Sequence, residues 1–150
     1  MDGTKICKTA VVVDDVGHYE ALGVAEFLQE NGASVTMVTS RKALGTEIES
    51  ALMVDPALER LDNGNFTLLT RHRLASIGEE DAVIGTTYEG GIEKTVDAET
   101  VVFISANKAN RALYVELDAA GVNVAVIGDA NSPRFMQVAV REGHLAAKAI

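Results

Sequence analysis

Residues 10–40 read AVVVDDVGHYEALGVAEFLQENGASVTMVTS, and their pattern determines the class of fold. The β-branched apolar run at residues 11–13 is typical of a strand that is buried on both faces. Apolar residues recur at helical spacing from Tyr19 to Asn31, and a second apolar run follows at residues 35–38. A strand, a helix and a strand in this order predict a βαβ unit, whose first turn carries the phosphates in dinucleotide-binding proteins.

The first turn of this unit lacks the glycine pattern GxGxxG and reads DDVGHYEALG over residues 14–23. Gly17 and Gly23 are its two glycines, and they lie farther apart than the pattern requires. Asp14 and Asp15 would repel a pyrophosphate, because two like charges about 4 Å apart cost on the order of 1 kcal/mol in water and more in a partly buried site.

Three interpretations of this turn stay open. The turn is structural, with acidic side chains that meet the positive end of the helix. Alternatively, Gly17 and Gly23 belong to an altered nucleotide site, or His18 and Tyr19 take part directly in a reaction.

The end of the second predicted strand bears on the choice of cofactor. NAD-binding proteins often place an acidic residue here, whereas NADP-binding proteins prefer a neutral residue with a nearby arginine. This chain has Ser40 and Arg41 at that point. A dinucleotide bound here is therefore predicted to be NADP rather than NAD, and the alternative is a solvated basic loop.

The rest of the chain continues the alternation of strands and helices, with one interruption. Close turns between short strands indicate antiparallel hairpins, because parallel strands need a crossover of a dozen or more residues. We predict further strands at 66–70, 100–105 and 122–127, helices at 56–61, 110–120 and 134–150, and an antiparallel meander built from 73–77, 82–88 and 92–96.

These elements predict an α/β fold of Rossmann-like, three-layer type. A mainly parallel sheet has helices on both faces, and the small antiparallel meander packs beside it or extends one layer. We expect one compact unit over residues 1–150. The alternative is that residues 108–150 stand apart and dock on a second copy, which would give a homodimer.

Composition excludes several classes of function. The chain has 150 residues with 47% apolar and 23% charged residues, which is typical of one globular domain. Its net charge of −9 argues against nucleic acid and against anionic membranes as partners. No apolar run approaches the roughly 20 residues of a membrane span, and no apolar leader is present, so a cytoplasmic setting is predicted.

No catalytic or metal-binding residue is predicted. The single cysteine, Cys7, excludes an internal disulfide framework and a CxxC metal site. The three histidines, His18, His72 and His144, do not have the spacing of metal ligands. The chain also lacks the GxSxG elbow of hydrolases and the GK[ST] ending of a phosphate loop.

Three segments together resemble one known family. They are residues 11–40, quoted above, residues 97–117 (DAETVVFISANKANRALYVEL) and residues 122–150 (VNVAVIGDANSPRFMQVAVREGHLAAKAI). They resemble the C-terminal region of the multidomain old-yellow-enzyme-type flavoproteins, the NADH:flavin oxidoreductase group that includes trimethylamine dehydrogenase and 2,4-dienoyl-CoA reductase. The resemblance covers nearly the whole chain, including the meander.

The resemblance implies a place for this chain in a larger protein. Family members have a TIM barrel with FMN, a cysteine cluster that holds an iron–sulfur centre, and two dinucleotide-type domains. Residues 8–107 are similar to the inserted NAD(P)H-type domain, and residues 108–150 to the returning tail of the FAD-type domain. We therefore expect a fragment of a larger flavin-dependent oxidoreductase that is not catalytic by itself. Its partners are the remaining domains of that protein, where FMN and the iron–sulfur cluster would lie.

The resemblance also implies a cofactor contact in the second half. Gly128 and Asp129 follow an apolar run, like the second FAD motif of glutathione-reductase-like enzymes, in which the aspartate accepts a hydrogen bond from a ribitol hydroxyl. A simple strand-to-helix turn is the alternative. In the crossover run, where the family commonly shows TGxRPN, Ala106 replaces the glycine, Lys108 replaces the arginine, and Asn110 matches.

Binding of NAD(P)H or of the FAD or ADP moiety is therefore predicted to be weak or lost in this chain. A degenerate, nucleotide-free module for architecture or dimerisation is the main alternative. A free-standing NAD(P)H-dependent reductase is a further one, although it requires a hydride acceptor that the sequence does not reveal.

Overall fold

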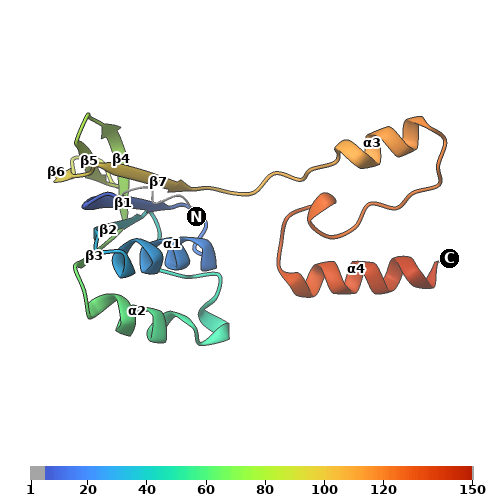
Figure 1. The fold of residues 1–150 in the computed structure, drawn as a ribbon, viewed down its shortest axis with the longest axis horizontal. Helices are drawn as coiled ribbons and strands as arrows, with labels where there is room; N and C mark the ends of the chain where they lie inside the picture. Colours follow the sequence, from blue (N-terminus) through green and yellow to red (C-terminus); the bar gives the residue numbers. More distant parts are fainter. Residues whose placement is uncertain (1–5, 150) are drawn as a thin grey trace. The chain divides into compact units, whose positions relative to one another are not determined.

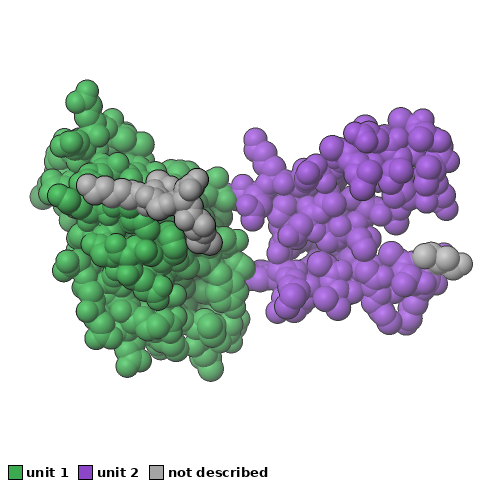
Figure 2. Space-filling view, viewed as in Figure 1, with its two compact units in different colours: residues 1–105 green, residues 106–150 purple. Residues whose placement is uncertain are grey.

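The structure is a computed structural model that describes residues 6–149. The chain divides into two compact units: unit 1, residues 1–105, and unit 2, residues 106–150 (Figure 2). The sequence predicts one compact unit, with residues 108–150 standing apart as the alternative, and neither sheet takes a strand from residues 106–149. The boundary after Ser105 lies close to the division at residues 107 and 108 that the family resemblance implies.

Unit 1 is built on a four-stranded parallel sheet (Figure 1). The strand order is β3 (Phe66–Thr70), β2 (Ser34–Thr39), β1 (Thr9–Asp14) and β7 (Thr100–Ile104). In the register, Val12 of the central strand β1 lies opposite Met37 on one side and Val102 on the other. Because β1 has a neighbour on each side, its end is held firmly at the edge where the first turn begins.

Two helices cover one face of this sheet, namely α1 (Tyr19–Glu30) and α2 (Val54–Asp62) (Figure 1). A one-turn 3-10 helix, η1 (Glu49–Ala51), precedes α2. The apolar faces of the helices and the sheet form one core, to which α1 and α2 contribute Ala21, Leu22, Ala25, Leu28, Ala57 and Leu61. The predicted βαβ unit and the predicted helix around Pro56 are confirmed.

The opposite face of the parallel sheet is covered by the antiparallel meander. Its strands are β4 (His72–Ile77), β5 (Asp81–Thr86) and β6 (Glu93–Asp97), in that spatial order. Alternate residues of β5 point inward, and Ala82 and Ile84 join Val11, Val13, Val38 and Ala98 in a second core. The α/β class is confirmed, and in unit 1 the meander occupies the face on which the sequence predicts helices.

Unit 2 contains α3 (Ala112–Ala119), the 3-10 turn η2 (Gly128–Ala130) and α4 (Met136–Lys148). The strand predicted at residues 122–127 is wrong, because this segment pairs with no strand among residues 6–149. Its last residue, Ile127, has an extended backbone with φ −137° and ψ 165°. Neither α3 nor α4 contains a buried residue in this structure. The predicted last residue of the final helix, Ile150, lies outside the described residues.

Candidate functional site

The turn after β1 is organised by the side chain of Asp14. Asp14 is the last residue of β1, and it is fully buried. Its Oδ1 atom accepts hydrogen bonds from the backbone N–H groups of Val16, at 3.1 Å, and of Gly17, at 2.7 Å. A carboxylate of the chain itself therefore accepts the hydrogen bonds of two backbone N–H groups that precede α1.

Gly17 is the one residue of this turn at which both conformation and space require glycine. Its φ of +70° lies in the left-handed region, which side chains disfavour. A Cβ atom at Gly17 would lie 2.7 Å from Thr46 Oγ1 and 3.0 Å from Arg41 Cδ. The glycine thus permits a close approach, but the atoms that approach it belong to the protein's own loop.

This loop, residues 40–48, is fixed against the turn by Arg41. The guanidinium Nη1 of Arg41 donates to Thr46 Oγ1 and to Glu47 Oε1, each at 2.9 Å. The backbone N–H of Glu47 donates to the carbonyl oxygen of Gly17 at 3.0 Å. Arg41, which the sequence offers as a contact for NADP, is therefore engaged by Thr46 and Glu47.

The other two residues predicted for this nucleotide site do not join it. Gly23 lies on the exposed face of α1, and nothing lies within 4 Å of the position that its Cβ would take. Close packing of α1 on the sheet is made instead by Ala21 and Ala25, which are fully buried. Ser40 is exposed at the end of β2. The structure thus brings Gly17 and Arg41 together and leaves Gly23 and Ser40 at the surface.

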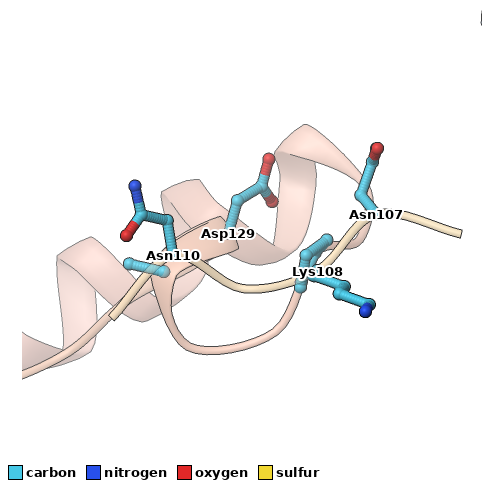
Figure 3. A pocket seen from close by; sticks show the side chains of 6 residues that line it. Asn107, Lys108, Asn110 and Asp129 are labelled. Atoms are coloured by element: carbon cyan, nitrogen blue, oxygen red, sulfur yellow. The ribbon is translucent and has the colours of Figure 1, made fainter. Parts of the chain in front are cut away.

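A pocket of about 300 Å³ lies in unit 2 (Figure 3). Two separate segments line it, the crossover run after β7 and the turn η2. The lining residues are Asn107, Lys108, Asn110, Asp129, Ala130 and Pro133. The structure therefore brings the predicted FAD-motif residue Asp129 together with Lys108 and Asn110. Ala106 is exposed and is not among the lining residues.

The turn that carries Asp129 is held by α4. Gly128 has φ +61°, and its backbone N–H donates to Glu142 Oε2 at 2.8 Å. Arg134 Nη2 donates to Glu142 Oε1 at 2.5 Å. The hydrogen bond from Gly128 is the largest influence on Glu142 and lowers the pKa of its carboxyl, with the charge of Arg134 acting in the same direction and burial opposing both. Sequence reasoning missed Glu142, because nothing in the local sequence pairs it with Gly128.

Arg111 connects the start of α3 to the same turn. Its Nε donates to the carbonyl oxygen of Ala130 at 3.1 Å, and its Nη2 donates to the carbonyl oxygen of Asn131 at 2.5 Å. Asn110 Oδ1 accepts a hydrogen bond from the backbone N–H of Ala112 at 3.2 Å. These bonds fix the pocket rim on two sides, and Arg111 is a second residue that sequence reasoning missed.

Among residues 6–149, no group of three or more His, Cys, Asp or Glu side chains is placed to hold a metal ion. No helix in the same part of the chain has the length and apolar character needed to cross a membrane.

Comparison with known proteins finds no matching family model, but several similar structures. Histamine dehydrogenase from Rhizobium sp. 4-9 is 23% identical with a TM-score of 0.83, over 97% of this chain and 24% of that chain. The 6-hydroxypseudooxynicotine amine oxidase from Pseudomonas geniculata N1 is 24% identical with a TM-score of 0.83, over 92% of this chain and 21% of that chain. The HOCl-induced flavoprotein disulfide reductase RclA from Escherichia coli is 12% identical with a TM-score of 0.63, over 97% and 36%.

Among curated proteins, an uncharacterized ABC transporter ATP-binding protein, YwjA from Bacillus subtilis (strain 168), is 32% identical over 74 residues. That match covers 49% of this chain and 12% of the longer protein. The chain thus spans about a quarter or less of the first two solved structures and an eighth of the curated relative. The predicted resemblance to the trimethylamine dehydrogenase group is confirmed for the fold, which this chain shares with one part of much longer oxidoreductases.

Proposed function

We propose that this chain is the dinucleotide-binding-type region of a larger flavin-dependent oxidoreductase. In that protein, unit 2 helps to hold FAD or its ADP part, and the chain performs no catalytic step of its own. The observation that carries the proposal is the pocket that Lys108, Asn110 and Asp129 line together (Figure 3). The similar structures support the same assignment, because the first two are a dehydrogenase and an amine oxidase.

The chemistry of the pocket suits part of a flavin nucleotide. The Lys108 ammonium is a point charge that can bind a phosphate, and the Asn107 and Asn110 amides offer both donors and acceptors. Asp129 would accept a hydrogen bond from a ribitol or ribose hydroxyl, as the family resemblance implies. When bound, FAD supplies the electron-accepting chemistry, and these residues bind and orient it.

The size of the pocket limits what this chain can hold alone. Small-molecule sites range from about 300 to 1,000 Å³, and the pocket in unit 2 is about 300 Å³. It can take one part of a flavin nucleotide rather than the whole molecule. The remaining contacts, the FMN centre, the iron–sulfur cluster and the substrate site are assigned by this proposal to other domains of the complete protein.

Ligand titration of the chain tests the proposal directly. FAD and ADP should raise the melting temperature, with a gain of roughly 2.7 kcal/mol at 100 times the dissociation constant. Asp129→Asn should reduce the response to FAD, whereas Lys108→Ala should reduce the responses to both FAD and ADP. The matched controls are Asp118→Asn and Lys148→Ala, which alter exposed residues of the same unit. Absence of any response to FAD and ADP would reject the proposal.

A second candidate is a nucleotide-free module for packing in the complete protein. The observation that favours it is the lack of any buried residue in α3 or α4, which leaves the apolar side chains of Leu113, Met136 and Val140 exposed. In this case the chain would show no ligand response, and addition of the remaining domains would bury these three side chains. Hydrogen exchange of α3 and α4, with and without those domains, would detect that burial.

A further inference from the structure

The first turn of unit 1 has the framework of a dinucleotide site but not its two working features. Such a site needs backbone N–H groups that are free to bind phosphate at the start of the helix. It also needs a glycine that lets the pyrophosphate come close to the backbone. In this chain the corresponding N–H groups are those of Val16 and Gly17, and the corresponding glycine is Gly17.

Two backbone donors in the turn just before α1 are already used. The N–H groups of Val16 and Gly17 both donate to Oδ1 of Asp14, at 3.1 and 2.7 Å. Asp14 is fully buried at the end of a central strand, so its carboxylate cannot swing into solvent without breaking the packing around it. The internal anion thus stands where a phosphate would bind.

The space beside the glycine is also used. Arg41 and Thr46 lie against Gly17 so closely that a Cβ atom there would be 2.7 Å from Thr46 Oγ1. The arginine is held by Glu47, and the N–H of Glu47 closes the arrangement by donating to the Gly17 carbonyl. A pyrophosphate could approach Gly17 only if this loop were displaced.

Charge strengthens the closure. Asp14 Oδ2 and Arg41 Nε are both buried, and neither has a hydrogen-bond partner among the described residues. Asp14 Oδ1 accepts a hydrogen bond from the backbone N–H of Gly17, and Arg41 Nε lies 3.0 Å from the position that a Cβ atom of Gly17 would take. Both side chains therefore border the same glycine. An incoming phosphate would meet the Asp14 carboxylate, and repulsion between like charges works against a wrong partner.

We propose that the first turn of unit 1 is closed to dinucleotides. Asp14 takes the place of the phosphate, and Arg41 covers Gly17, where the pyrophosphate would approach the backbone. Asp14 and Arg41 are then the residues that determine specificity at this turn, and they do so by exclusion. Arg41 is not a ligand for the 2′-phosphate of NADP. This inference concerns unit 1, so it does not depend on the flavin contact proposed for unit 2.

Amide signals of the ¹⁵N-labelled chain test the closure with NADPH, NADH and ADP as probes. The signals of Val16 and Gly17 should not move with any of the three. Movement of these signals with any of the three probes would overturn the proposal. Loss of an NADPH-induced movement in Arg41→Ala but not in Lys42→Ala would identify Arg41 as a ligand. Binding at the unit 2 pocket would move signals at Asp129 instead, so the two proposals can fail separately.

Hydrogen exchange tests the role of Asp14 as the internal anion. In Asp14→Ala, the Val16 and Gly17 amides should exchange about tenfold faster or more, because each loses a charged acceptor. Asp15→Ala removes the same charge from the adjacent exposed residue and should leave both rates unchanged. If Asp14→Ala does not fold, Asp14→Asn replaces it and should show intermediate rates, since its amide oxygen still accepts. Equal rates in the Asp14 and Asp15 variants would refute the proposal.

Discussion

Glu142 on α4 accepts a hydrogen bond from the backbone N–H of Gly128, 14 residues earlier, at a distance of 2.8 Å. This single contact joins a helix to the turn that presents Asp129 to the pocket. It satisfies a backbone donor in a turn that has no strand neighbour, and it places a negative charge beside Arg134. The lowered pKa of the Glu142 carboxyl follows first from this hydrogen bond.

The first prediction concerns pH. Because the folded chain lowers the pKa of Glu142, its contribution to stability is complete above the ordinary glutamate pKa of about 4.3 and is lost as pH falls through the lower folded value. Glu142→Gln should remove part of the acid dependence of α4 helicity, whereas Glu116→Gln on the exposed surface of α3 should not. Circular dichroism between neutral and acidic pH measures this. The same acid dependence in both variants would contradict the prediction.

The second prediction compares Gly17, in the first turn of unit 1, with Gly23, in helix α1. Gly17→Ala should destabilise unit 1 by about 1–3 kcal/mol, because the added methyl group meets Thr46 at a positive φ. Gly23→Ala should stabilise it by about 0.8–1 kcal/mol, because Gly23 lies within a helix and has open space around it. Urea denaturation of both variants measures the change in unfolding free energy, which should have opposite signs in the two. Destabilisation by Gly23→Ala would show that the exposed face of α1 packs against something.

The third prediction concerns the core beneath α2. Leu61 is fully buried between the helices and the sheet, so Leu61→Ala should cost about 2–5 kcal/mol of unfolding free energy. Leu52 is 81% exposed, and Leu52→Ala should change stability by less than about 0.5 kcal/mol. Both values come from the same denaturation series. Similar costs for the two substitutions would place Leu52 in a contact that this structure does not show.

The fourth prediction concerns backbone strain at the same exposed leucine. Leu52 has φ +56°, in the left-handed region that costs a side chain roughly 1–2 kcal/mol. Leu52→Gly should therefore be more stable than Leu52→Ala by up to about 1 kcal/mol, after the greater freedom of glycine in the unfolded chain is counted. The melting temperatures of the two variants show which of them is the more stable. A less stable glycine variant would mean that the chain relaxes away from the left-handed conformation.

The sequence was a good guide wherever periodicity and burial agree. β1, α1 and β2 follow directly from the apolar pattern around Val12 and Leu22, because both faces of β1 and one face of α1 are buried. The meander was also predictable, since the turns between its strands are too short for parallel crossovers. Its position over the second face of the sheet was not predictable. Ala82 and Ile84 are apolar and point inward, but their sequence does not indicate which surface they pack against.

Unit 2 shows where such reasoning ends. The run from Val122 to Ile127 has the composition of a buried strand, but a strand also needs a neighbour to receive its backbone hydrogen bonds. No strand within residues 6–149 provides one. The pocket was partly predictable, since Asp129 and Asn110 stand in recognisable motifs. Its supports Glu142 and Arg111 act over long sequence separations, which a local pattern does not encode.

The hydrogen bonds from Val16 and Gly17 to Asp14 also change how unit 1 responds to the cell around it. A separate molecule that binds only the folded state stabilises it in proportion to the logarithm of its free concentration. A carboxylate that belongs to the chain is present at the turn at every concentration of nucleotide. If the turn is closed to dinucleotides as proposed, the stability of unit 1 does not depend on the free concentration of NAD or NADP, because the anion that binds Val16 and Gly17 is part of the chain.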